Sequence, residues 1–163
     1  MKEEILGMVN IREVIKEDLE TLGEIFVEVY TVFDVGERWE KESAVKLMEY
    51  WFNKQPDLAY LVEFEDRIVG AFFTAIKPWW DGNRLFDGEF FIHPEFQNKK
   101  IGKKLFKKVL EEAVEKYDVK IFDAFTFNGP DFPLSWYKKL GFKEIKEWTM
   151  FSGNVQEVLK NLS

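Results

Sequence analysis

The segment between residues 86 and 127 limits the fold of this chain more than any other part of it. An apolar stretch at 86–93 stops at Pro94, which restricts the backbone of the residue before it. Residues 101–117 then place apolar side chains at the spacing of a helix packed on a core, and 119–127 are rich in β-branched and aromatic residues. A strand, a long helix and a second strand predict a parallel crossover within one sheet.

The remaining segments predict an α+β fold around that crossover. Further strands are predicted at 9–15, 58–63, 68–76 and 142–151, further helices at 17–29, 42–53, 134–140 and 155–162, and turn-rich loops at 30–40 and 78–85. This order predicts a mixed, mostly antiparallel sheet of six to seven strands with helices on both faces. The chain has 163 residues and no linker or low-complexity tract, so we expect a single domain over 1–163.

Composition excludes several kinds of site. The chain has no Cys and one His, which rules out disulfides, thiolate metal ligands, a Cys nucleophile and any two-His metal site. Its net charge of −7 disfavours general binding to nucleic acid or to an anionic membrane. The first ten residues lack the apolar core of a secretory signal, and no apolar run approaches ~18 residues. We therefore expect a cytoplasmic protein, and its many Lys and Glu residues hint at a thermophile.

The residues 99–108 form the most basic part of this acidic chain. They carry six lysines and no acid, so the segment has a charge of +6 and the rest of the chain −13. Because the segment opens a predicted helix, whose first backbone N–H groups are unpaired, it indicates a site for a phosphate or another anion. A solvated helix face is the alternative. A Walker A loop is excluded, since Gln97 stands where that motif needs Gly and Lys104 where it needs Ser or Thr.

Three further patterns occur together in this chain. Residues 92–102 read Ile-His-Pro-Glu-Phe-Gln-Asn-Lys-Lys-Ile-Gly, residues 135–142 read Ser-Trp-Tyr-Lys-Lys-Leu-Gly-Phe, and residues 11–20 join a short strand to an acidic helix start. In this order they resemble the acyl-CoA loop, the late helix-to-strand motif and the first strand and helix of the GNAT superfamily of N-acetyltransferases. One departure is Lys100, which stands at the first glycine of the loop pattern, where Gly would permit positive φ and close approach to a ligand.

The resemblance implies a GNAT-like fold and acetyl-CoA as co-substrate, without a metal. The backbone of Phe91 and Ile92 would pair with the pantetheine arm like an added strand. The loop and the first helical turn would hold the cofactor's phosphates through Gln97, Asn98, Lys99, Lys100, Ile101, Gly102 and Lys103. Asn128 is a further expected cofactor contact, although Gly129 and Pro133 make the connection after it longer than usual.

Two residues are candidates for the chemistry of acetyl transfer. A primary amine is almost fully protonated at pH 7, so a general base near the acceptor would speed the reaction. Glu89, inside an apolar strand, is the candidate base, with Asp87 as the reserve; the alternative for Glu89 is an edge carboxylate paired with a Lys or Arg. The resemblance makes Tyr137 the candidate acid that protonates the leaving thiolate, and the alternative is an aromatic packed beside Trp136.

The two predicted loops are expected to form the wall of the acceptor site and to hold a cationic amine by charge and cation–π contact. An equal alternative is that their aromatic residues only cover the hydrophobic core. The residues concerned are Trp39, Trp79, Trp80, Asp34, Glu37 and Asp81. The spacing of Asp81, Asn83 and Asp87 fails the EF-hand pattern, so no metal site is predicted. His93 stands at a strand end before Pro94 and is interpreted as structural or solvent-exposed.

Together these observations predict an acetyl-CoA-dependent N-acetyltransferase that acts by direct transfer in a ternary complex, because no Cys is present to carry an acetyl group. A small cationic amine is the favoured acceptor, and peptide or protein amines stay open. A homodimer is compatible with the sequence. One alternative is a non-catalytic member of the same fold that binds an acyl-CoA or another protein. Another is a nucleic-acid or phosphoprotein binder, which the acidic remainder of the chain opposes.

Overall fold

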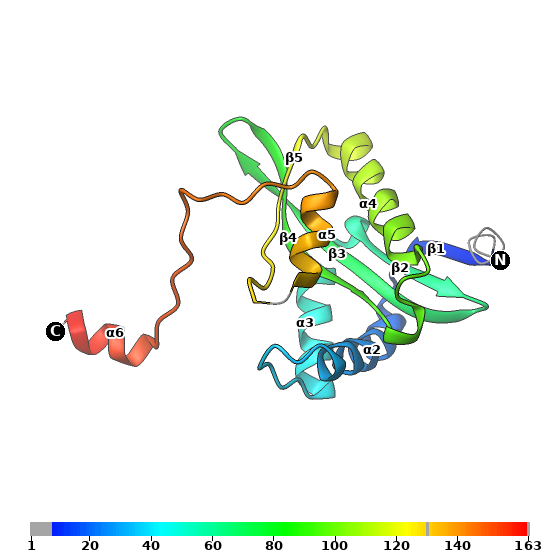
Figure 1. Cartoon of the computed structure of the whole chain (residues 1–163), viewed down its shortest axis with the longest axis horizontal. Helices are drawn as coiled ribbons and strands as arrows, with labels where there is room; N and C mark the ends of the chain where they lie inside the picture. Colours follow the sequence, from blue (N-terminus) through cyan, green and yellow to red (C-terminus); the bar gives the residue numbers. More distant parts are fainter. Residues whose placement is uncertain (1–7, 130, 163) are drawn as a thin grey trace. The chain divides into compact units, whose positions relative to one another are not determined.

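The computed structural model describes residues 8–129 and 131–162 (Figure 1). They fall into two compact units, Met1–Phe125 and Thr126–Ser163. The described elements of the first unit are β1 (Val9–Glu13), η1 (Lys16–Asp18), α2 (Leu19–Val32), α3 (Lys41–Lys54), η2 (Pro56–Leu58), β2 (Ala59–Phe64), β3 (Arg67–Trp79), β4 (Gly82–Ile92), η3 (Pro94–Phe96), α4 (Ile101–Tyr117) and β5 (Ile121–Asp123). Those of the second unit are α5 (Asp131–Lys139) and α6 (Val155–Leu162).

The first unit is built on one sheet with the strand order β1-β2-β3-β4-β5. The first four strands pair antiparallel, and β5 pairs parallel with β4 after the crossover through α4. The mixed, mostly antiparallel sheet and its crossover are therefore confirmed. The expected count of six to seven strands is wrong for the described residues, which form five.

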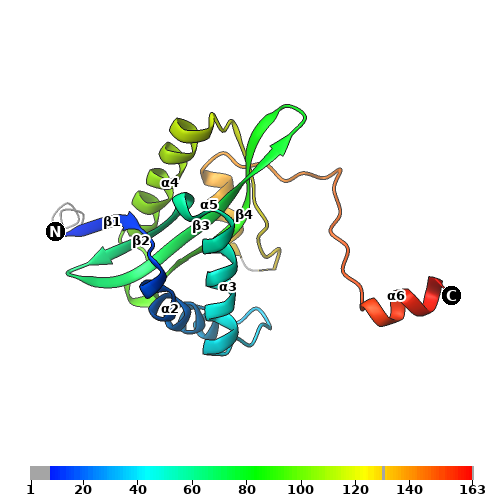
Figure 2. The same cartoon turned by 180° about the vertical axis from the view of Figure 1, so that it is seen from behind.

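Helices cover both faces of this sheet, as predicted (Figure 2). On one face, apolar side chains of α2 and α3 pack on the strands and form a buried core. The helices contribute Leu22, Phe26, Ala44 and Met48, and the strands contribute Leu61, Ala71, Phe73 and Phe91. On the other face, Phe106 of α4 stacks on Phe72 of β3 with the ring centroids 5.1 Å apart and the planes 2° from parallel. Alternation along each strand produces this division, because successive side chains point to opposite faces.

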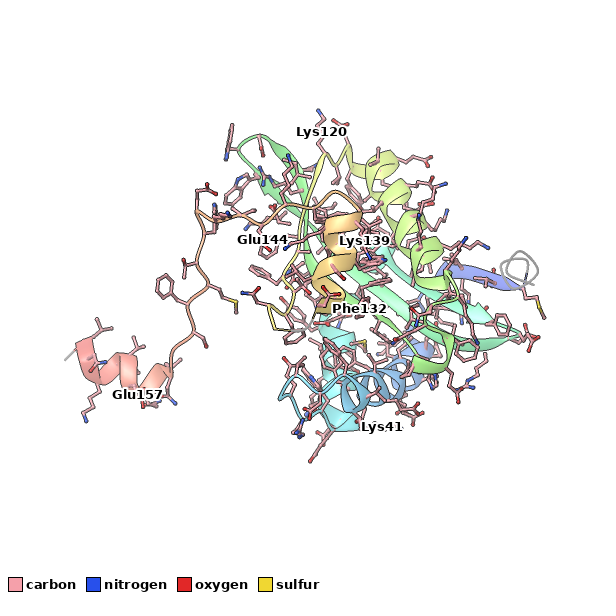
Figure 3. All side chains as sticks on the ribbon, in the orientation of Figure 1. Lys41, Lys120, Phe132, Lys139, Glu144 and Glu157 are labelled. Atoms are coloured by element: carbon pink, nitrogen blue, oxygen red, sulfur yellow. The ribbon has the colours of Figure 1, made fainter. Side chains whose placement is uncertain are left out.

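Ion pairs fasten the N-terminal elements to this core. Arg12 of β1 donates from both of its terminal nitrogens to the Asp18 carboxylate, at 2.7 and 2.9 Å, and Asp18 also accepts the backbone N–H of Ile15. Lys41, labelled in Figure 3 at the start of α3, pairs with Glu24 of α2 at 2.7 Å. These contacts fix the entry of α2 and the α2–α3 pairing on the sheet.

The connection predicted at 78–85 is wrong, because β3 and β4 form one long hairpin. Their pairing continues to Trp79 opposite Gly82, which leaves only a two-residue turn at Trp80 and Asp81. Arg84 stabilises the hairpin end through ion pairs with Asp81 and with Asp123 of β5. The aromatic and turn-forming residues of this segment indicated a loop, but cross-strand contacts override that local signal.

The second unit confirms the predicted late helix, which begins at Asp131 and ends at Lys139. Gly141 has a φ of +97°, and its N–H donates to the Lys138 carbonyl at 3.0 Å. The N–H of Phe142 donates to the Tyr137 carbonyl at 3.1 Å. These two bonds form a Schellman motif, so Gly141 ends the helix as its sequence predicted.

The strand predicted at 142–151 is wrong, since the structure assigns no strand there. Its apolar residues Phe142, Ile145 and Trp148 recur every three positions rather than alternating, which is a weak strand pattern. The described residues of this unit also contain no other strand, so an isolated one would leave its backbone groups unpaired.

Candidate active site

A β-bulge in the middle of β4 shapes the candidate site. Gly88 lies opposite Thr74 and Leu85 opposite Ile76, so two residues of β4 face one residue of β3. Asp87 and Gly88 both have positive φ, at 53° and 139°. A Cβ on Gly88 would lie 1.9 Å from the Phe73 carbonyl oxygen, so only glycine fits there. The bulge therefore bends β4 at the residue pair that precedes Glu89.

The bulge also explains why β5 is shorter than the predicted 119–127. The β4–β5 ladder covers only Arg84–Phe86 opposite Ile121–Asp123. Beyond it, the described residues of the first unit give β4 no partner strand on that side from Asp87 to Ile92. This open edge includes Phe91 and Ile92, and its backbone groups are of the kind an extended arm can pair with.

Glu89 lies on the face of the sheet that α2 and α3 cover. It pairs with Phe73 across the ladder and alternates with Phe91, which packs on Phe26 at 5.3 Å. Burial raises the pKa of its carboxyl to about 8, and the charges of Asp87 and Glu37 act in the same direction. No cation among the described residues offsets this, so the alternative of a Lys- or Arg-paired carboxylate does not apply. Such a carboxyl is poised to exchange a proton near neutral pH.

Asp87, the reserve base, is also largely enclosed. Burial raises the pKa of its carboxyl, which backbone hydrogen bonds from Phe125 and Gly88 and the charge of Lys54 partly oppose. The Asp87 carbonyl accepts the Thr74 hydroxyl at 2.7 Å. Two carboxyls with raised pKa values therefore lie at the bulge, Asp87 within it and Glu89 just after it, and Glu89 has the larger shift.

The loop between α2 and α3 lies beside Glu89 and carries acidic and aromatic residues. Glu37, whose charge acts on Glu89, accepts the indole N–H of Trp39 at 2.7 Å. Trp39 packs edge-on against Phe26 at 5.2 Å, which joins this loop to the same face of the sheet. A cavity of about 140 Å³ is lined by Tyr30, Thr31, Glu37, Arg38, Trp39 and Glu40. Its aromatic and carboxylate lining suits a cation.

Trp79 and Trp80 do not belong to this wall. Trp79 pairs with Gly82 at the end of the hairpin, six residues along β3 from Phe73, the partner of Glu89. At about 3.3 Å per residue this is a separation of roughly 20 Å. Lys77 and Arg84 lie over the Trp79 ring, at 4.4 and 6.0 Å, so this tryptophan stabilises the hairpin.

The predicted cofactor loop runs from the end of β4 to the start of α4. Asn98 and Lys100 are left-handed, with φ of 60° and 65°, and Lys100 is the N-cap of α4 without a side-chain capping bond. For a lysine this conformation costs roughly 1–2 kcal/mol. The Lys100 side chain therefore does not cap the helix start, an arrangement that suits an anion site. A Cβ on Gly102 would lie 3.2 Å from both Phe90 and Ile92, so the helix start packs closely on β4.

Side chains near the loop hold it in place. The Gln97 amide donates to the Ile92 carbonyl at 2.9 Å, so it braces the turn. His93 is buried, accepts the Glu95 N–H at Nδ1, and lies with Nε2 2.7 Å from a Glu28 carboxylate oxygen. Of the two interpretations given for His93, the structural one is confirmed, because the residue ties the loop to α2, and the solvent-exposed one is wrong, because the side chain is buried.

The six lysines divide into two groups. Lys107 and Lys108 pair with Glu111 and Glu112 one turn later, and Lys104 donates to the Val9 carbonyl. These three form a solvated helix face, as the alternative reading stated. Another three, Lys99, Lys100 and Lys103, are exposed at the loop and the first turn of α4. Only this second group remains a candidate for an anionic ligand.

Tyr137 and Asn128 belong to the second unit. Tyr137 lies on α5, its ring 5.2 Å from Trp136 and 5.1 Å from Phe142. Its carbonyl accepts the capping bond from Phe142, so the motif at 135–142 has a clear local role in ending the helix. The catalytic role of Tyr137 and the cofactor contact of Asn128 stay predictions.

Trp51 lies on α3, within the helix predicted at 42–53, and the sequence analysis assigned it no functional role. Its side chain is 6% exposed, its Nε1 has no hydrogen-bond partner among the described residues, and it acts on Glu89 by lowering the carboxyl pKa. A buried indole N–H normally finds an acceptor. That rule was the one available signal, but the sequence does not reveal which acceptor lies nearby.

A family comparison agrees with the observed loop, strand and helix motifs. The model of the acetyltransferase (GNAT) family matches residues 19–142. The chain belongs to this family. The match includes the bulged strand with Glu89, the loop before α4 and the helix ending at Gly141. No described helix is long and apolar enough to cross a bilayer, and no group of three or more potential metal ligands gathers among the described residues.

Individual relatives are more distant. An uncharacterized N-acetyltransferase of Methanocaldococcus jannaschii is 27% identical over 146 residues, covering 85% of this GNAT chain and 63% of that protein. The chain thus spans less than two thirds of the curated relative that it matches.

Solved structures show the same fold. A predicted acetyltransferase of Clostridium acetobutylicum, solved with acetyl-CoA, has a TM-score of 0.69 and 20% identity, over 92% of this chain and 98% of that one. An aminoglycoside N-acetyltransferase in complex with CoA has a TM-score of 0.68 and 17% identity, over 90% and 95%. At these identities the likeness concerns the fold.

Proposed function

We propose that this GNAT protein is an N-acetyltransferase that moves the acetyl group of acetyl-CoA to a primary amine by direct transfer in a ternary complex. The observation that carries the proposal is the position of Glu89. It lies on the strand that ends at the cofactor loop, three residues before Ile92, and the pKa of its carboxyl is about 8. A base matched to neutral pH therefore adjoins a strand edge and a helix start suited to an acyl-CoA.

Separate residues of the chain bind the co-substrate, accept a proton and donate a proton. The open edge at Phe91 and Ile92 holds the extended arm of the co-substrate, and the uncapped first turn of α4 with Lys99, Lys100 and Lys103 holds its phosphates. Glu89 accepts the proton that the acceptor ammonium must lose, directly or through water. The amine nitrogen then bonds to the acetyl carbon as the C–S bond breaks, and Tyr137 protonates the departing thiolate. The nitrogen gives up its second proton, which restores the Tyr137 hydroxyl directly or through water, and the proton held by Glu89 passes to solvent.

A small cationic amine is the acceptor we favour. The charges of Asp87 and Glu37 both act on Glu89, and the cavity that Glu37 lines adds Glu40 and the rings of Tyr30 and Trp39. The positive charges nearby are Lys54 and Arg38, and Arg38 is already paired with Asp34 at 2.8 Å. The excess of carboxyl groups favours a positively charged ligand. The aminoglycoside acetyltransferase of the same fold makes aminoglycosides reasonable probes.

Two measurements test the proposal. Calorimetric titration with acetyl-CoA, compared with ATP, should show tight binding to acetyl-CoA and little to ATP. An amine panel of diamines, aminoglycosides, amino acids and a peptide should then release free thiol with at least one acceptor, and about 100-fold more slowly in Glu89→Gln than in wild type. Binding without turnover over the whole panel would favour a non-catalytic acyl-CoA-binding protein. No binding at near-millimolar acetyl-CoA would overturn the cofactor site.

A further inference from the structure

The indole N–H of Trp51 is a buried donor without a partner. Trp51 is 6% exposed, and its Nε1 meets no acceptor with hydrogen-bond geometry among the described residues. A buried donor without an acceptor destabilises the folded protein. A change in the protonation of a neighbouring group can remove this cost if it supplies the acceptor. Such an orphan group therefore calls for an explanation in terms of function or of a second state.

Glu89 is a carboxyl on which that donor acts. The Trp51 N–H lies close enough to this carboxyl to lower its pKa, although it does not complete a hydrogen bond in the observed geometry. A protonated carboxyl is a weaker acceptor than a carboxylate, and hydrogen bonds to an ionised acceptor are shorter and stronger. The donor therefore gains its partner when Glu89 loses its proton.

A lysine on the same helix strengthens the donor. The Lys54 ammonium lies 4.7 Å from the centre of the Trp51 ring and 5.4 Å from that of Tyr50. A cation over the face of an indole draws electron density from the ring, which makes its N–H a better donor. The groups that face Glu89 are then Asp87 of β4, Glu37 of the α2–α3 loop and Trp51 of α3, with Lys54 acting on Asp87.

We propose that Trp51 is a positioning residue for the base: its indole N–H hydrogen-bonds the ionised carboxylate of Glu89 and holds it toward the acceptor amine. This inference rests on the proposed function only where it assigns a use to the bond. The bond itself is a property of the free protein. The charges of Asp87 and Glu37 disfavour the ionised form of Glu89, and the Trp51 donor favours it. The bond also fixes the orientation of the carboxylate while Glu89 is ionised and able to act as a base.

Nuclear magnetic resonance tests the bond without any enzyme assay. In ¹⁵N-labelled wild type, the indole N–H signal of Trp51 should shift downfield with rising pH and follow the same titration as the ¹³C-labelled Glu89 carboxyl. In Glu89→Gln this inflection should be absent. An indole signal that does not move while Glu89 titrates would overturn the proposal. A signal that moves only when an acceptor amine is added would also overturn it, because the indole N–H would then respond to the bound ligand and not to Glu89.

A pair of variants tests the use of the bond. Trp51→Phe keeps an aromatic ring but removes the donor, so the pKa on the acidic limb of the kcat/KM profile, which reports Glu89, should rise and kcat/KM at pH 7 should fall about threefold to tenfold. At a pH well above that pKa the two enzymes should differ by less than about twofold. Trp79→Phe, in the hairpin, is the matched control and should leave the pH profile unchanged. A Trp51→Phe enzyme with the wild-type profile would overturn the positioning role.

The outcomes separate the two levels of the argument. If Trp51 and Glu89 titrate together but no amine is acetylated, the bond stands and the proposed function fails. If turnover is found but the indole signal ignores Glu89, the function stands and this inference fails. Should Trp51→Phe not fold, the wild-type titration with its Glu89→Gln control decides the question alone.

Discussion

Neighbouring residues of one strand lead into two different environments. Phe90 of β4 points to the α4 face, where its ring packs with Phe72 and Phe106 at 5.3 Å each. Glu89 points to the α2 and α3 face, where its carboxyl lies among two other carboxyls and an unpartnered indole N–H. The α4 face at Phe90 is packed with apolar rings, as expected of a hydrophobic core. The α2 and α3 face at Glu89 instead contains buried polar groups. Such a local departure is typical of a functional site.

The largest expected effect concerns the aromatic face. Phe72→Ala removes a side chain that is 1% exposed and stacked on Phe106, so the free energy of unfolding should fall by about 4 kcal/mol. Chemical denaturation measures this loss. Val114→Ala, at an exposed position of α4, is the control and should change it by less than about 0.5 kcal/mol. A loss below about 2 kcal/mol would mean that this face is not a tightly packed core.

On the opposite face, Glu89→Gln should affect catalysis instead. Loss of the base should lower kcat/KM about 100-fold, within the usual range for general acid–base residues. Free-thiol release with the best acceptor measures the change. Glu49→Gln, exposed on α3, serves as the control and should retain the wild-type rate. Equal rates in wild type and Glu89→Gln would transfer the role to Asp87 or to water.

In the second unit, Tyr137 has both an observed packing role and a predicted catalytic role. Tyr137→Phe keeps the ring contacts with Trp136 and Phe142 but removes the hydroxyl. If the hydroxyl protonates the thiolate, kcat should fall at least about tenfold with an unchanged melting temperature. Steady-state kinetics and thermal unfolding, done together, separate the two roles. An unchanged kcat would leave Tyr137 as a packed aromatic.

Stability should also depend on pH through Glu89. The pKa of its carboxyl is raised in the folded state, so the folded state binds this proton more tightly than the unfolded one. Its contribution is complete below about pH 4.5 and is lost as pH rises toward about 8. The melting temperature should therefore fall by at least about 3 °C more over this range in wild type than in Glu89→Gln. Parallel curves for the two proteins would show that Glu89 titrates normally.

The smallest effect is expected in the cofactor loop. Lys100→Gly relieves a left-handed lysine with φ of 65°, so stability should rise by about 1 kcal/mol or less. Lys99→Gly is the matched control, because Lys99 is not left-handed and glycine there should be destabilising. Thermal unfolding and calorimetric titration with acetyl-CoA follow both variants. A destabilised Lys100→Gly would show that the lysine side chain itself supports the loop.

Much of the fold was predictable because its signals are local. The helix at 101–117 has its expected bounds, since a long amphipathic period and the residues at its ends lie in one stretch of chain. The helix ending at Gly141 was predictable for the same reason, because Gly favours the left-handed C-terminal position. The parallel crossover followed from the order of these elements alone.

The errors involve elements that depend on distant partners. The hairpin of β3 and β4 extends through a segment with turn-forming residues, because pairing across the sheet outweighs local preference. The segment 142–151 was predicted as a strand, but strand formation requires a neighbour that the described residues of its unit do not provide.

The candidate site shows the same division. The sequence by itself determined that an acid lies in an apolar strand ahead of a basic helix start, and that Lys100 replaces a glycine. Only the tertiary structure decided that a bulge flanks Glu89, that burial and two carboxyls raise its pKa to about 8, and that Trp51 brings an unpartnered donor beside it. The physical reason is that a pattern along the chain records which side chains are present, whereas burial and electrostatic neighbours depend on segments far apart in sequence.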